Sequence, residues 1–192
     1  MFPTVRSNQR GFSLIDMLAV ITIIVTVSAI AVPGMLGAME RVRLGQSTRE
    51  VERELQMAKA RAVVKGRAMR VRFNCPEPGQ YRIVELLGTP STPLAADTAV
   101  NRCTEALYPY PAADADPVTT PNLDGPVRLL DSTVSFSVAQ TIEFRANGTA
   151  FYEAAAGDFD LIPVAGIPIQ LVRNGVTSTI TVNGIGKVQL QQ

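Results

Sequence analysis

Few side chains in this 192-residue chain could carry out chemistry, and their types restrict what that chemistry could be. The chain has no histidine, which excludes Ser-His and Cys-His nucleophilic pairs and histidine-ligated metal sites. Its two cysteines, Cys75 and Cys103, are too few for a four-cysteine zinc site. Asp158 and Asp160 flank Phe159 and could offer ligands to calcium, but two carboxylates do not define a site, and solvated turn residues are the better interpretation. We therefore expect no catalytic residues, no metal and no cofactor, and the composition favours a protein that is not an enzyme.

One acidic residue, Asp16, lies near the start of a long apolar segment, residues 12–39. The segment has 28 residues, and a helix needs roughly 20 to cross a bilayer, so we expect a transmembrane helix. Ser13 and Asp16 have the spacing of a helix-capping pair, in which a carboxylate suits the positive end of the helix. Alternatively, Asp16 pairs with a cation inside the membrane. The residues alone leave both interpretations open.

Pro33 and Gly34 lie deep inside the same apolar segment. Proline removes one backbone hydrogen bond from a helix, and glycine weakens the next turn. We therefore expect a kink or local melting of the helix near residue 33.

The motif Gly-Phe-Ser-Leu-Ile-Asp-Met-Leu at residues 11–18 closely resembles the N-terminal signal of type IV pilins and type II secretion pseudopilins. In that family, a prepilin peptidase cleaves after the glycine and methylates the new N-terminal amine. The resemblance implies cleavage between Gly11 and Phe12 and N-methylation of Phe12. It also implies that Asp16 pairs with the N-terminal amine of a neighbouring subunit, although the family has glutamate there, which is longer by one methylene. Pro33 lies where the family commonly has a helix-breaking proline.

The charged residues on the two sides of the apolar segment give conflicting indications of its orientation. Arg6 and Arg10 favour a cytoplasmic N-terminus, whereas the more numerous arginines after residue 40 favour the reverse. The resemblance implies a cytoplasmic N-terminus, a single pass through the bacterial inner membrane and a periplasmic or extracellular globular domain, which joins a filament after assembly. The implied partners are other pilin or pseudopilin subunits, the prepilin peptidase and the inner membrane.

Residues 40–66 have the pattern of an amphipathic helix that continues the apolar one. Val51, Leu55, Ala58 and Ala62 are spaced to form one apolar stripe. A basic residue followed by glycine at Lys65-Gly66 is typical of a helix end. The first half of this long helix would lie in lipid and the second half on a globular domain.

After residue 66 the apolar pattern alternates every second residue, which predicts strands. The expected strands are 68–73, 80–86, 127–138, 140–146, 159–162, 167–173, 176–182 and 187–190. Residues 88–126 are rich in Pro, Ala, Asp and Thr and are predicted to form a long irregular loop. The predicted organisation is a leader peptide at 1–11, a transmembrane helix at 12–39, its amphipathic continuation at 40–66 and an antiparallel β domain at 67–192. This is an α+β arrangement of a long helix packed on an antiparallel sheet, which the resemblance identifies with the pilin fold.

Further segments, residues 58–66, 142–149 and 184–188, resemble a group of minor pilins that includes the secretion pseudopilin H and the pilus protein FimT. The resemblance implies a minor pilin or pseudopilin, a structural subunit of a type IV pilus or a type II secretion pseudopilus. With the domain outside the cytoplasm, Cys75 and Cys103 would lie where disulfides persist. We expect them to pair, the alternative being two separate buried thiols.

The alternative function is a FimT-like DNA-binding minor pilin that acts in DNA uptake. Residues 40–72 carry ten basic and four acidic side chains and could contact phosphates, with Arg41, Arg43 and Lys187 as candidate contacts. Arginines just after a transmembrane helix can equally lie near anionic lipid headgroups. Residues 73–192 carry six basic and twelve acidic side chains, and only Lys187 is basic in the stretch 186–189, where DNA-binding members carry Gly-Arg-x-Arg. The structural role is therefore the leading hypothesis.

Overall fold

The computed structural model describes residues 13–111 and 123–191, and the chain divides into two compact units after residue 40. One helix, α1 (Leu14–Lys65), contributes its first part to the N-terminal unit and its second part to the C-terminal unit. The helix ends at the predicted place: Gly66 follows Lys65 with a φ of 66°, in the left-handed region that glycine adopts at low cost.

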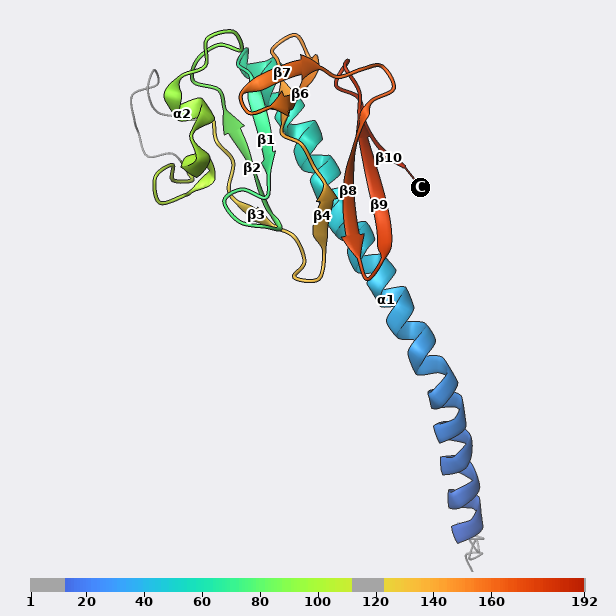
Figure 1. The fold of residues 1–192 in the computed structure, drawn as a ribbon. Helices are drawn as coiled ribbons and strands as arrows, with labels where there is room; N and C mark the ends of the chain where they lie inside the picture. Colours follow the sequence, from blue (N-terminus) through green and yellow to red (C-terminus); the bar gives the residue numbers. More distant parts are fainter. Residues whose placement is uncertain (1–12, 112–122, 192) are drawn as a thin grey trace, which may run out of the picture. The chain divides into compact units, whose positions relative to one another are not determined.

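The strands of the described residues form two antiparallel sheets in the C-terminal unit (Figure 1). The six-stranded sheet has the order β3-β2-β1-β5-β6-β7 and the four-stranded sheet the order β10-β9-β8-β4. The first sheet contains β1 (Met69–Phe73), β2 (Gln80–Glu85), β3 (Arg128–Leu129), β5 (Ile142–Phe144), β6 (Ala150–Ala155) and β7 (Asp158–Leu161). The second contains β4 (Ser135–Val138), β8 (Ile167–Arg173), β9 (Val176–Val182) and β10 (Val188–Gln191). The predicted α+β arrangement is confirmed.

A single apolar core joins the second part of α1 to both sheets. The predicted stripe of Val51, Leu55, Ala58 and Ala62 is completely buried. It packs in one cluster with inward side chains of both sheets: Met69, Val71, Ile83, Ile142, Phe144, Ile169, Leu171 and Ile180. The apolar side chains spaced for a helix and those that alternate along the strands therefore pack against each other in one core, as the sequence pattern predicts.

The strand predictions differ from the structure in two places. The segment predicted as one strand, 127–138, is two strands in different sheets, because Asp131 begins a turn whose backbone closes between Asp131 O and Val134 N at 2.8 Å. The strand β6 was not predicted, because its alanines and glutamate have low strand propensity. Its place in the sheet comes from pairing with β5 and β7 on either side.

The segment predicted as an irregular loop contains two short helical turns, α2 (Ala95–Thr98) and η1 (Val100–Cys103). We call residues 86–111 and 123–127 the covering loop. In Figure 1, β2 and β1 separate α2 from α1. The helical turns α2 and η1 of the covering loop therefore lie on the face of these two strands opposite α1, whereas its residue Leu123 packs against the core that includes α1.

Candidate functional site

The N-terminal part of α1 presents an apolar surface on all sides. Every large apolar side chain that the structure describes between residues 14 and 39 is about half exposed or more: Leu14, Ile15, Met17, Leu18, Val20, Ile21, Ile23, Ile24, Val25, Val27, Ile30, Val32, Met35 and Met39. The helix is long and apolar enough to cross a membrane. A helix that is apolar all round is normally covered by lipid or by other helices.

The two threonine hydroxyls within this surface are satisfied by the helix itself. The hydroxyl of Thr22 donates to Leu18 O at 2.8 Å, and that of Thr26 donates to Ile23 O at 2.9 Å and Thr22 O at 3.0 Å. Such bonds remove the cost of placing a hydroxyl in an apolar environment. The threonines are therefore compatible with a helix that is surrounded by lipid or by apolar helices.

Asp16 is different, because its charge has no partner within the described residues. It lies in the first turn of α1, it is exposed, and no described residue forms an ion pair with its carboxylate. The predicted cleavage residues, Gly11 and Phe12, lie outside the described residues. Asp16 is the one charged side chain of the described segment 13–39.

The helix continues without interruption through Pro33 and Gly34. The kink at Pro33 and Gly34 stays a prediction.

The three candidate DNA contacts do not form one cluster. Arg43 on α1 faces Asp131, which precedes β4, with 4.0 Å between Nη1 and Oδ2. Arg41 is exposed on the same helix. Lys187 directly precedes β10, and β10 and β4 are the two opposite edges of the four-stranded sheet.

The covering loop is fixed to the sheet by a disulfide at one point. Cys75 and Cys103 are bonded, with a Cα–Cα distance of 5.6 Å, which confirms the predicted pairing. Cys75 follows β1 and Cys103 ends η1, so the bond ties the covering loop to the β1–β2 hairpin.

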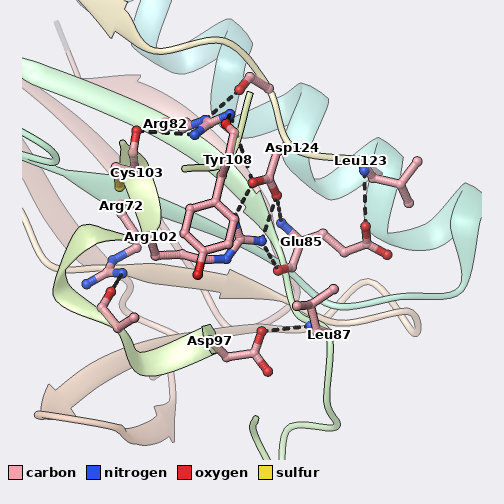
Figure 2. A network of polar contacts seen from close by, with 12 residues as sticks. Arg72, Arg82, Glu85, Leu87, Asp97, Arg102, Cys103, Tyr108, Leu123 and Asp124 are labelled. Carbon is pink, nitrogen blue, oxygen red and sulfur yellow. Dashed lines mark hydrogen bonds and ion pairs between the residues drawn. The ribbon is translucent and has the colours of Figure 1, made fainter. Parts of the chain in front are cut away.

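A buried ionic network fixes the same loop at several further points, and Figure 2 shows its members. Arg102 of η1 donates to both carboxylate oxygens of Asp124, to Oδ1 at 2.9 Å, and to Glu85 O at 3.0 Å. Its guanidinium also lies over the Tyr108 ring, 4.4 Å from the centroid. Arg102 is completely buried and Asp124 nearly so. A buried guanidinium of this kind is tolerated only with a bidentate carboxylate and further acceptors.

Arg82 of β2 reaches the loop through main-chain oxygens. It donates to Gly125 O at 2.7 Å, Tyr108 O at 2.7 Å and Cys103 O at 3.2 Å. Its Nη2 is 4.0 Å from Asp124, and burial lowers the pKa of Arg82 below the ordinary arginine value. These three bonds of Arg82 therefore fix the backbone of the covering loop and do not depend on which side chains the loop carries.

Two carboxylates complete the attachment by accepting backbone N–H groups. Asp97 accepts from Leu87 N, Gly88 N and Leu94 N at 2.7–2.9 Å. Asp124 accepts from the amide of Glu85 at 2.7 Å. These bonds satisfy backbone donors that the loop would otherwise bury without partners.

A second ionic group lies on the same face of the sheet, at β1 and β5. Glu143, which is fully buried, accepts from Arg70 at 2.9 Å and from Arg145 at 2.9 Å. Arg70 also donates to Asp97 O at 3.2 Å, and the neighbouring Arg72 donates to Ala99 O at 2.9 Å. Burial is the main cause that lowers the pKa of Arg72.

Most of these charged residues are buried, which was not predicted from the sequence. The available signal was the alternation of β1, in which Arg70 and Arg72 alternate with Met69, Val71 and Phe73. Alternation predicts two different faces but does not say whether the polar face meets water or a loop.

No family model matches the chain, and no curated protein matches it. Among solved structures, the chain is similar to the type IV minor pilin FimU of Pseudomonas aeruginosa, with a TM-score of 0.45, 16% identity and coverage of 80% of this chain and 91% of that one. It is also similar to the minor pseudopilin EpsH from the type 2 secretion system of Vibrio cholerae, with a TM-score of 0.43, 11% identity and coverage of 78% and 96%.

Proposed function

We propose that this chain is a minor pilin or pseudopilin, a non-enzymatic structural subunit of a type IV pilus or a type II secretion pseudopilus. Prepilin peptidase would cleave it after Gly11 and methylate Phe12, and its apolar helix would hold it in the bacterial inner membrane before assembly. The N-terminus would be cytoplasmic and the β domain would lie outside. The N-terminal motif at residues 11–18 and the long helix with a lipid-compatible surface both support this function.

The observation that carries the proposal is the carboxylate of Asp16. It is the one charged group in the described segment 13–39, its surroundings along the helix are apolar, and no described residue pairs with it. A carboxylate costs about 2.5–3.5 kcal/mol at the centre of a bilayer on insertion scales and less towards the interface, so an unpaired acid near the start of the apolar segment still favours an arrangement that supplies a cation. The methylated amine of a neighbouring subunit would be that cation.

The first test is the intact mass and N-terminal sequence of the protein isolated from native membranes. We expect a chain that begins at N-methylated Phe12. A chain that still begins at Met1 would contradict processing, and Asp16 would then be only a helix cap.

The second test separates the role of the charge from that of the helix. Asp16→Ala should abolish incorporation into filaments in shear-fraction immunoblots, whereas Asp16→Glu, which restores the longer acid, should retain it. The matched control is Ser28→Ala, a polar change in the same helix without a charge. Equal incorporation of Asp16→Ala and wild-type protein would refute pairing through this carboxylate.

The DNA-binding alternative has less support, because Arg43 faces Asp131 and Lys187 lies at the opposite edge of the four-stranded sheet. Its test is a titration of the full chain in micelles with duplex DNA at low and moderate salt. Binding that falls steeply with salt would favour it, and no binding at low salt would exclude it.

A further inference from the structure

Arg173 is a buried cation whose hydrogen bonds are incomplete. Its side chain is 7% exposed, and its Nε and Nη1 atoms are buried without a hydrogen-bond partner. Buried guanidinium groups normally have their donors satisfied, so an unsatisfied one indicates a missing anion or water.

Its position explains why it is buried. Arg173 is the last residue of β8, and it shares the inward face of that strand with Ile169 and Leu171, which lie in the core. The aliphatic part of Arg173 therefore extends the core stripe, and its guanidinium lies where that stripe ends.

Among the described residues, Asp131 has a carboxylate within 4.0 Å of this guanidinium, and this carboxylate accepts hydrogen bonds from another residue. Oδ1 of Asp131 accepts from Thr133 Oγ1 at 2.6 Å and Thr133 N at 3.1 Å. It is 4.0 Å from Nη1 of Arg173, and Oδ2 is 4.0 Å from Nη1 of Arg43. Both distances are too long for hydrogen bonds, so one carboxylate loosely balances two arginines.

The chain itself fixes how far this cluster can lie from the apolar segment. Arg43 follows Met39, the last residue of that segment, by four residues, and four residues span at most about 14 Å. The headgroup region adds about 5–7 Å on each side of the hydrocarbon core of a bilayer, so Arg43 is close to the lipid phosphates when the apolar segment spans that core.

Apolar side chains beside the two arginines fit the same environment. Val42, next to Arg43, is 59% exposed, and Val176, which pairs with Arg173 across the β8–β9 hairpin, is 45% exposed. Arginine with exposed apolar neighbours is a combination suited to the membrane interface.

We propose that Arg43 and Arg173 form a binding site for the phosphate group of an anionic phospholipid, with Asp131 as the internal group that the phosphate replaces. Arginine suits this ligand because its planar group donates to two phosphate oxygens at once. The phosphate accepts hydrogen bonds from Arg43, whose side chain is 54% exposed. In place of Asp131, which is 4.0 Å away, it also accepts from the guanidinium of Arg173. The inference rests on the membrane anchorage of the proposed function.

Native mass spectrometry of the full chain in detergent micelles, titrated with phosphatidylglycerol, tests the site. Arg43→Gln should weaken lipid binding about tenfold, which is the effect of losing one charge-assisted hydrogen bond. Asp131→Asn should strengthen it several-fold, because the amide keeps an acceptor for Thr133 while the competing charge is lost. Arg49→Gln, an exposed arginine on the same helix, is the matched control and should bind as wild type does.

Arg43 is exposed, and Asp131→Asn keeps the acceptor for Thr133, so we expect both decisive variants to fold. Arg173→Gln adds support if lipid binding falls while the melting temperature is retained. Lipid binding by Arg43→Gln and Asp131→Asn equal to that of wild type would overturn the site. Binding of inorganic phosphate or duplex DNA through Arg43, without competition by phosphatidylglycerol, would overturn the lipid as its ligand.

The fate of the N-terminus separates this inference from the proposed function. An unprocessed chain that binds phosphatidylglycerol through Arg43 would contradict the proposed function alone. A chain cleaved after Gly11 whose lipid binding ignores Arg43 and Asp131 would contradict the lipid site alone.

Discussion

The two faces of strands β1 and β2 are covered in opposite ways. On one face, α1 packs apolar side chains such as Val51 and Leu55 against Met69 and Val71. On the other face, the covering loop is held by the disulfide, by arginines and by buried carboxylates. The first cover is non-directional, and the second depends on particular hydrogen bonds.

The two kinds of cover therefore affect different properties: the free energy of folding and the position of the covering loop. Burial of apolar surface stabilises a fold roughly in proportion to area, whatever the detailed geometry. A buried ion pair adds little net stability, but removal of one partner leaves a costly unpaired charge. The helix face therefore supplies most of the folding free energy, and the loop face fixes one path for a segment with little apolar surface of its own.

The largest expected effect is on the loop face. Asp124→Ala leaves Arg102 buried without its bidentate partner and should lower the free energy of unfolding by about 3–5 kcal/mol. Urea titration of the full chain in micelles, followed by tyrosine fluorescence, measures this. Arg102→Met/Asp124→Leu, which removes both charges, is the control and should cost less than Asp124→Ala. An equal loss in the single and double variants would show that the charge itself is not the cause.

A change on the helix face should lower the free energy of unfolding by a similar amount, but it should affect hydrogen exchange in a different part of the chain. Leu55→Ala creates a cavity in the core and should cost about 3 kcal/mol. Hydrogen exchange should then accelerate in α1 and both sheets together, whereas Asp124→Ala should release mainly residues 86–111. Val64→Ala, at a side chain that is 78% exposed, should change stability by less than about 0.5 kcal/mol. The comparison fails if both core and network variants give the same exchange pattern.

Loss of the disulfide should have an effect of comparable size. The bond joins residues separated by 28 positions, for which the chain-entropy model gives about 3–4 kcal/mol. Cys75→Ser/Cys103→Ser should therefore lower the free energy of unfolding by that amount in the same urea titration. Wild-type protein under reducing conditions is the matched comparison, and unchanged stability in both would mean that the ionic network alone defines the loop.

The smallest effect concerns pH and the turn before β4. Hydrogen bonds from Thr133, together with Arg43 and Arg173, hold the pKa of Asp131 below its ordinary value of 3.8. A depressed folded pKa stabilises the fold above the unfolded pKa, and this contribution is lost as pH falls through the folded value. In micelles without anionic lipid, the stability difference between wild type and Asp131→Asn should therefore shrink below about pH 4. A difference that is constant with pH would exclude this titration.

The parts of the fold that follow from periodicity could be predicted. The buried stripe from Val51 to Ala62 and the end of α1 at Lys65 depend on local spacing, which the sequence displays directly. The disulfide followed from the expected location of the domain. The confirmed features are therefore those in which local chemistry decides the structure.

The parts that depend on distant partners could not be predicted. Asp124 and Arg102 lie in a segment of polar composition. Folding alone brings them next to each other and next to Glu85 and Arg82. Strand β6 owes its conformation to its neighbours in the sheet rather than to its own residues. Arg173, likewise, looks like an ordinary residue before an Asn-Gly turn, and its burial follows from the packing of β8.

The arginines of the sheet contact the covering loop mainly through its carbonyl groups: Arg82 binds three of them, and Arg70 and Arg72 bind one each. Every residue type supplies a carbonyl, so most loop side chains are free to change without loosening the attachment. Exposed positions such as Val100, at 90% exposure, and Leu107, at 59%, should accept almost any substitution in a saturation screen, whereas Asp97, Arg102 and Asp124 should accept very few. The exposed side chains on the covering loop can therefore change, and with them what the loop recognises, while the sheet and the backbone path of the loop stay the same.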